Sequence, residues 1–156
     1  MKTSERGKDL IKQFESCRLE SYADPKTCGP PFTCGWGSTG PSIGPETVWS
    51  QEQADERFDE DLAQFEKMVT DAVTVPLTQN QFDALVSIVY NVGPGSKSKD
   101  GILHLRDGGP STLIRCLNAG SYDLASEQFL RWVSPGSSVT KGLLRRRTAE
   151  RELFDA

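Results

Sequence analysis

The sequence is poor in the residues that build metal sites, disulfide scaffolds and membrane spans. Among its 156 residues it has one histidine and four cysteines. The single His104 has no Cys-x2-Cys pair beside it, so a zinc site is a poor interpretation. Four cysteines in a chain of this length do not make a disulfide scaffold. No run of about 18 apolar residues occurs, which predicts no membrane-spanning helix and no stable association with a membrane.

The four cysteines differ in their surroundings. Cys17 and Cys116 lie in helix-like stretches, and we expect both to be buried as small apolar side chains. Cys28 and Cys34 flank a tight Gly-Pro-Pro segment and could meet across a loop. The sequence leaves two states of this pair open, a disulfide and two free thiols.

The polar first residues and the length of the chain limit the architectures that are possible. Residues 1–9 have no apolar core segment, so they do not have the form of a secretory signal. Apolar residues make up 36% of the chain, which is low but sufficient for a globular fold. A length of 156 residues suits one domain over residues 1–156, with a moderate core in two lobes.

Charge is distributed unevenly along the chain. The net charge is −4, with acidic residues concentrated over 46–66 and basic residues over 141–151. The basic run could form a face that meets an anionic polymer, or each run could be a solvated helix surface; both interpretations stay open. Nucleic acid is an unfavourable partner, since the net charge is negative and no aromatic residues are interleaved with the arginines at 145–147.

Local patterns in the first half predict a helix, a small sheet and a second, longer helix. Apolar spacing predicts a helix over residues 5–16. Glycine, proline and aromatic residues over 18–40 favour a hairpin or a three-stranded sheet. The capping box Ser50-x-x-Gln53 then starts a long helix that we expect to link two lobes.

The second half is predicted to be helical. The capping box Thr78-x-x-Gln81 starts a helix that ends at Gly93. The turn-rich segment 94–110 is expected to be a surface insertion with a brief ordered core at Ile102–Leu105, dispensable for chemistry. The alternative is a structural segment in which His104 and Leu105 pack under the helical lobe. Together with the sheet these elements predict an α+β fold. Further helices are expected at about 111–119, 122–132 and 141–153.

Two acidic residues near the start are candidates for acid–base chemistry. Glu15 ends the first predicted helix, and Asp24 precedes Pro25 where the chain must turn. A carboxyl at a helix end and a carboxyl at a turn can face each other. Hydrolysis of a glycosidic bond needs such a pair, with one carboxyl protonated and the other ionised to direct a water molecule.

Ordered motifs lie around these two residues and along the rest of the chain. They are Ile11–Glu15, Leu19–Asp24 and Thr33–Thr39, then Leu77–Leu85 with Tyr90–Gly93, then Ser111–Leu113, Leu117–Gly120, Arg131–Val133, Gly142-Leu143 and Arg146–Glu150. Together they resemble the phage-type lysozymes, which cut peptidoglycan, over about residues 8 to 154. The resemblance implies a lysozyme-like fold with a sheet lobe at about 14–50, a helical lobe at 70–156 plus 1–13, and a cleft between them.

The resemblance assigns catalytic roles to three residues. It implies that Glu15 is the general acid and that Asp24 and Thr33 hold and direct the water. The spacing from Asp24 to Thr33 is three residues longer than is usual in the family, so Thr27 is a competitor by spacing. Ser38 stands where the family usually has histidine, which predicts a change in local stability rather than in chemistry.

Four residues are candidate substrate contacts, and three of them have a structural alternative. Trp36, Tyr90, Asn91 and Ser111 are the expected sugar contacts. Tyr90 and Asn91 could instead cap and pack their helix, and Ser111 could instead cap the next one. The resemblance also makes Arg146 or Arg147 a candidate ion-pair partner of Glu15, and Trp132 is expected to pack in the core.

These assignments imply a particular activity. We expect hydrolysis of the β-1,4 bond between N-acetylmuramic acid and N-acetylglucosamine with inversion, without a metal or organic cofactor. The expected protein is a monomer, made in the host cytoplasm and acting on the cell wall after a separate release factor such as a holin. A peptidoglycan-binding module that does not cut is the alternative, but it would be expected to lack Glu15 or Asp24.

Overall fold

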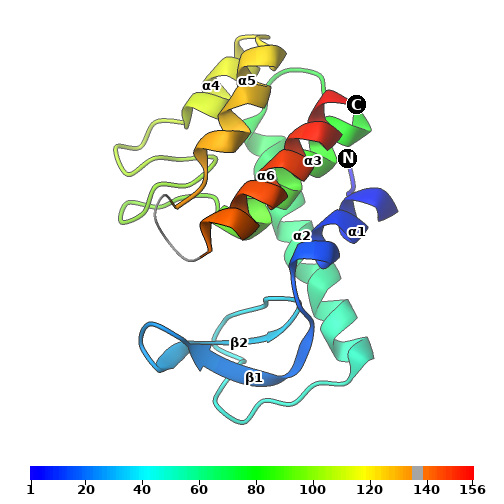
Figure 1. The fold of residues 1–156 in the computed structure, drawn as a ribbon, viewed down its shortest axis with the longest axis vertical. Coiled ribbons are helices and arrows are strands. Elements are labelled where there is room, and N and C mark those ends of the chain that lie inside the picture. Colours follow the sequence, from blue (N-terminus) through cyan, green and yellow to red (C-terminus); the bar gives the residue numbers. More distant parts are fainter. Residues whose placement is uncertain (135–138) are drawn as a thin grey trace. The chain divides into compact units, whose positions relative to one another are not determined.

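The computed structural model describes residues 1–134 and 139–156, and within them it has an α+β fold (Figure 1). The prediction of fold class is therefore confirmed. The elements in chain order are α1 (Glu5–Phe14), β1 (Arg18–Asp24), β2 (Gly29–Gly35), α2 (Gln51–Ala72), α3 (Gln79–Val92), α4 (Thr112–Asn118), α5 (Tyr122–Gln128), the 3-10 helix η1 (Phe129–Arg131) and α6 (Thr140–Asp155).

The chain divides into two compact units. The sheet unit comprises Lys12–Ala63, and the helical unit comprises Met1–Ile11 with Gln64–Ala156. Both boundaries fall inside helices, in α1 and in α2. The sheet unit therefore holds the end of α1, the hairpin and the first part of α2.

The hairpin is the only regular sheet among the described residues. Strands β1 and β2 pair antiparallel, with Arg18 opposite Gly35, Tyr22 opposite Thr33, and Asp24 opposite Gly29. Register irregularities interrupt the ladder on both sides of Tyr22. Of the two predicted forms, the hairpin is thus correct and the three-stranded sheet is not formed.

Helix α2 supplies much of the core of the sheet unit. Ala54, Phe58 and Leu62 are at most 1% exposed and recur every four residues, so they share one helix face. The capping box predicted at its start is present, since Gln53 N donates to Ser50 Oγ at 3.1 Å and Ser50 N donates to Gln53 Oε1 at 2.8 Å. These bonds satisfy backbone donors that the first turn of a helix leaves unpaired.

The helical unit is built around α3. Every residue from Phe82 to Val89 is buried, and α3 packs against α6 while α4 packs against α5 (Figure 1). Thr78 and Gln81 form the predicted capping box at the start of α3. Gly93 ends the helix with a φ of 96°, a left-handed backbone conformation that glycine adopts without steric strain.

The segment 94–110 is part of the packed structure, so the prediction of a surface excursion is wrong, while its dispensability for chemistry stays a prediction. Ile102 is fully buried and Leu103 is 2% exposed. The backbone of Gly101 lies so close to that of Gly95 that any side chain on Gly101 would collide with it. His104 itself is exposed, but its carbonyl accepts from Gly101 N at 2.9 Å. The segment buries two aliphatic side chains, so shortening it would leave a cavity.

All four cysteines are free thiols. Cys28 is exposed in the hairpin turn, whereas Cys34 is buried and its Sγ lies 3.5 Å from the carbonyl oxygen of Arg18. Burial raises the pKa of the Cys34 thiol. The disulfide alternative for this pair is therefore not realised. Cys17 is half-buried in the connection after α1, not in a helix as predicted, and Cys116 is half-buried in α4.

None of the helices in the two described ranges combines the length and the apolar character needed to cross a bilayer.

Candidate active site

Glu15 directly follows the last residue of α1 and is half-buried. A Cβ atom placed on Gly37 would lie 3.1 Å from Glu15 Oε2, so the carboxylate lies against the turn that follows β2. Gly37 has a φ of 88°, and its missing side chain leaves the space that the carboxylate occupies. The Gly35-x-Gly37 pattern in the sequence thus has a physical meaning, because it brings the backbone close to Glu15.

Asp24 and Thr33 lie on neighbouring strands of the hairpin. Asp24 ends β1, and its Oδ1 accepts a hydrogen bond of 2.7 Å from the backbone N–H of Lys26. Thr33 lies in β2 directly opposite Tyr22, two residues before Asp24 along β1. Both side chains are half-buried. The hairpin therefore brings into one small sheet two residues that are separated by a long connection in sequence.

Thr27, the competitor of Thr33 by spacing, has a structural role in the hairpin turn. Thr27 is exposed in the turn, and its hydroxyl donates to the carbonyl of Pro30 at 3.0 Å. The same hydroxyl oxygen accepts from the N–H of Gly29 at 3.3 Å. Thr27 therefore holds the lengthened turn together, and the extra residues form the tip of the hairpin.

Trp36 is anchored to α2. Its indole N–H donates to Asp55 Oδ1 at 2.7 Å, and Lys12 Nζ lies 5.0 Å from the ring centroid and 3.5 Å from the same carboxylate oxygen. The indole hydrogen bond, together with those from Gln51 and Lys12, holds the pKa of Asp55 below its usual range. The indole donor is thus used inside the protein, and the ring also packs against that of Phe58 at a centroid distance of 6.3 Å.

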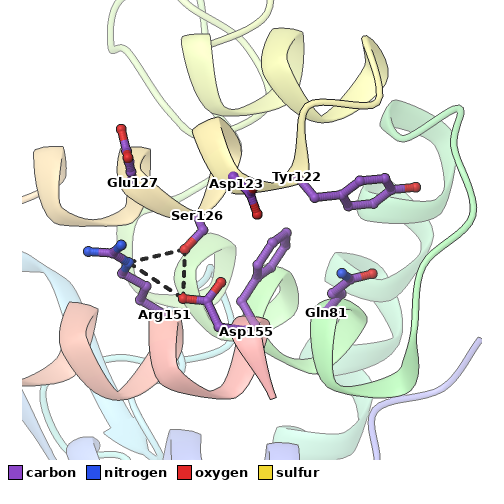
Figure 2. Close-up of a pocket in the computed structure, with 8 residues that line it drawn as sticks. Gln81, Tyr122, Asp123, Ser126, Glu127, Arg151 and Asp155 are labelled. Carbon is purple, nitrogen blue, oxygen red and sulfur yellow. Dashed lines mark hydrogen bonds and ion pairs between the residues drawn. The ribbon is translucent and has the colours of Figure 1, made fainter.

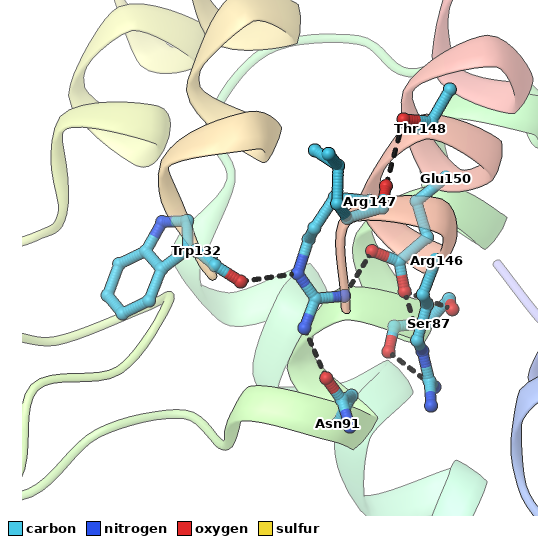
Figure 3. Close-up of polar contacts among 8 residues, drawn as sticks. Ser87, Asn91, Trp132, Arg146, Arg147, Thr148 and Glu150 are labelled. Carbon is cyan, nitrogen blue, oxygen red and sulfur yellow. Dashed lines mark hydrogen bonds and ion pairs between the residues drawn. The ribbon is translucent and has the colours of Figure 1, made fainter. Parts of the chain in front are cut away.

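Tyr90 and Asn91 lie in the last turn of α3, in the helical unit. Tyr90 is half-buried, and its ring meets that of Phe65 edge-on at a centroid distance of 5.5 Å. Asn91 is exposed, and its Oδ1 accepts a hydrogen bond from the guanidinium of Arg147 (Figure 3). Asn91 therefore remains available at the surface, while Tyr90 also has the packing role that was its structural alternative.

Ser111 caps the N-terminus of α4. It is 2% exposed, and its Oγ accepts from the N–H of Ile114 at 3.4 Å as the N-cap of α4. Because this hydroxyl is buried and used in the cap, it is not accessible to a sugar, and Ser111 is left out of the proposed substrate contacts. Ser38, in the position where the resemblance leads us to expect histidine, is also buried and donates to Asp61 Oδ2 at 2.6 Å.

A buried ionic cluster joins α3 and α6 (Figure 3). Glu150 is fully buried, with Arg146 Nε 3.1 Å from its Oε1 and Arg147 Nη1 2.5 Å from its Oε2. The hydroxyl of Ser87 also donates to Glu150 Oε1 at 2.7 Å. Two members of the basic run therefore lie inside the helical unit rather than on an open face. The pairing of one of them with Glu15 stays a prediction.

A hollow of about 380 Å³ in the helical unit is lined mainly by polar groups (Figure 2). Ser126 Oγ donates to Asp155 Oδ2 at 2.9 Å and accepts from Arg151 Nε at 3.1 Å. Arg151 and Asp155 are also 3.6 Å apart as an ion pair. These groups satisfy one another. The described part of the chain contains no group of three His, Cys, Asp or Glu side chains suited to a metal ion.

Comparison with solved structures defines the class of this fold. The muramidase domain of SpmX from Asticaccaulis excentricus superposes with a TM-score of 0.80 at 31% identity, covering 99% of this chain and 98% of that one. A mutant of P22 lysozyme superposes with a TM-score of 0.76 at 32% identity, covering 100% of this chain and 99% of that one. The fold is lysozyme-like, as the sequence motifs led us to expect.

Sequence comparison places the chain in a family. A profile of the phage lysozyme family matches residues 12–150, and the chain belongs to this family. The endolysin of Bacillus phage B103 is 38% identical over 154 residues, which is 99% of this chain and 54% of that protein. The endolysin of Salmonella phage P22 is 35% identical over 158 residues, covering 99% of this chain and 98% of that protein. The chain thus spans about half the length of the first relative and nearly all of the second.

Proposed function

We propose that this chain is a peptidoglycan hydrolase that cleaves the β-1,4 bond between N-acetylmuramic acid and N-acetylglucosamine. The observation that carries the proposal is the arrangement in the sheet unit, where Glu15 lies against the turn at Gly37 and one hairpin carries both Asp24, at the end of β1, and Thr33, opposite Tyr22 in β2. Membership of the phage lysozyme family and the muramidase neighbour support the same substrate class.

In the proposed mechanism, Glu15 donates its proton to the glycosidic oxygen as the bond breaks. Asp24, ionised, accepts a proton from a water molecule that Thr33 helps to orient. The water attacks the anomeric carbon from the face opposite the leaving group, so the configuration inverts. This route requires the two carboxyls to be roughly 6.5–9.5 Å apart, which leaves room for the water between them.

The ring of Trp36 and the side chains of Tyr90 and Asn91 are the proposed contacts to the glycan. We further propose that the protein acts as a monomer on the host cell wall, reaching it after a separate protein such as a holin permeabilises the membrane. Endolysins are the relatives of this chain, and lysis of the host is the outcome that this activity would produce.

Inversion predicts the first product formed. The substrate bond is β, so the newly released reducing end is expected to be the α anomer. Proton NMR of the earliest product, recorded before mutarotation, measures this directly. A β anomer would instead require a nucleophilic carboxylate and a separation of about 5–5.5 Å.

The roles of the hairpin residues predict graded losses. Asp24→Asn, which cannot accept the proton, is expected to lower turnover by roughly 100-fold or more. Thr33→Ala is expected to lower turnover less, since water can be directed by Asp24 alone. Thr27→Ala is the matched control, because it removes a similar hydroxyl from the same hairpin. If Thr27→Ala reduces turnover and Thr33→Ala does not, the assignment of Thr33 is wrong.

A further inference from the structure

Arg147 connects three separate segments of the helical unit from a fully buried position (Figure 3). One guanidinium nitrogen donates to Asn91 Oδ1 at the end of α3. The Nε donates to the carbonyl of Trp132 at 2.9 Å, and Nη1 donates to Glu150 Oε2 at 2.5 Å. Because the guanidinium is planar and held at several points, it presents Nη2 to Asn91 in one fixed direction.

The chemistry of this contact determines the orientation of the Asn91 amide. A guanidinium carries only hydrogen-bond donors, so the Asn91 atom that faces it must be the carbonyl oxygen and not the NH2 group. The amide nitrogen is consequently on the side away from Arg147. Asn91 is exposed, and its Nδ2 donates to no group among residues 1–134 and 139–156. Asn91 thus offers a pre-oriented donor at the protein surface.

The surroundings of Asn91 favour a ligand rich in acceptor oxygens. Asn91 and Arg147 line a pocket of about 320 Å³ in the helical unit, together with Lys99 and Arg131. Among the described residues that line it, Asp100 is the one acidic residue, and its Oδ1 is 3.4 Å from Arg106 Nε in an ion pair. A carbonyl or carboxylate oxygen would therefore meet donors and positive charge in this pocket.

We propose that Arg147 is a positioning residue, which holds Asn91 so that its amide NH2 donates to a carbonyl or carboxylate oxygen of the peptidoglycan strand. Peptidoglycan carries such oxygens on its acetamido groups and on its peptides. The inference rests on the proposed function and adds to it the direction of the hydrogen bond and the residue that sets it.

Asn91→Asp separates this role from a structural one. An aspartate keeps the acceptor that Arg147 needs, so the fold and the melting temperature are expected to be maintained. It lacks the NH2 donor, so KM for peptidoglycan fragments is expected to rise about 10-fold, the effect of losing one hydrogen bond, with a smaller change in kcat. Asn91→Ala is expected to raise KM similarly. Asn80→Asp, which adds the same charge to the same helix, is the control.

Two results would overturn the inference while leaving the proposed function in place. The first is an unchanged KM for the Asn91→Asp variant, when the separate Glu15→Gln variant has lost all activity. The other comes from NMR relaxation of the wild-type Asn91 side-chain amide. A positioned amide is expected to have an order parameter near that of rigid backbone, about 0.85, and a value below about 0.6 would show that Arg147 does not hold it. Activity that survives Glu15→Gln would instead contradict the proposed function itself.

Discussion

Glu15→Gln is expected to abolish lysis of bacterial cell walls while leaving the fold intact. Glutamine has nearly the same shape as glutamate, so it fits the same space against Gly37. It carries no acidic proton, and the leaving sugar oxygen must then depart as a poorly stabilised anion. General acid catalysis contributes on the order of 100- to 10,000-fold, and turnover is expected to fall by that factor.

The measurement is the clearing of a turbid suspension of outer-membrane-permeabilised bacteria, with the melting temperature recorded in parallel. Glu20→Gln is the matched control, because Glu20 is an exposed carboxylate on β1 of the same unit. It is expected to be as active as the unmodified protein. Retention of more than about a third of turnover by Glu15→Gln, with unchanged melting, would rule out Glu15 as the general acid.

The elements that could be predicted from the sequence are those with local signals. The capping boxes at Ser50 and Thr78 satisfy backbone donors within one turn, so four residues suffice to locate each helix start. The same is true of Gly93, whose left-handed backbone ends α3. The hairpin followed from turn residues and aromatic residues that lie close together in sequence.

The features that could not be predicted from the sequence depend on contacts between residues far apart in the chain. A high content of glycine in 94–110 suggested exposure, but Gly101 is required because it meets the backbone of Gly95. The burial of Ile102 depends on which helices surround it, and sequence spacing does not specify this. The state of Cys28 and Cys34 was undecided for the same reason, since the distance between two thiols is a tertiary property.

In the candidate site, too, local motifs were recognised from the sequence and contacts between distant residues were not. The motifs around Glu15, Asp24 and Thr33 fall in one unit of the fold, and the extra residues before Thr33 form the hairpin tip, while the catalytic roles stay predictions. The anchor of Trp36 on Asp55 was missed, because these residues are 19 positions apart.

The ionic cluster had a local signal that was not used. Arg146 and Arg147 precede Glu150 by four and three residues, the spacings at which helix side chains meet. The interpretations of the basic run as a charged surface, and of Arg146 or Arg147 as a partner of Glu15, did not include this pairing. Once buried, the cluster becomes a determinant of stability, and Glu150 is its one carboxylate among the described contacts.

Glu150→Ala is expected to be strongly destabilising. The side chain of Glu150 is fully buried between two buried guanidinium groups, and it also accepts from Ser87. Removing one partner of a buried ionic contact leaves uncompensated charge in a medium of low polarity, which typically costs about 3–5 kcal/mol. For a domain of this size, such a loss lowers the melting temperature by about 10 °C.

The comparison that isolates this effect is Glu152→Ala, because Glu152 is an exposed carboxylate on the same helix. Its free energy of unfolding is expected to change by no more than about 0.5 kcal/mol. Urea unfolding of both variants measures the two free energies on one scale. Equal midpoints for Glu150→Ala and the unmodified protein would mean that the two arginines find other partners or water without Glu150. A large loss confined to Glu150→Ala would establish that this carboxylate holds α6 to α3, and with it the guanidinium that orients Asn91.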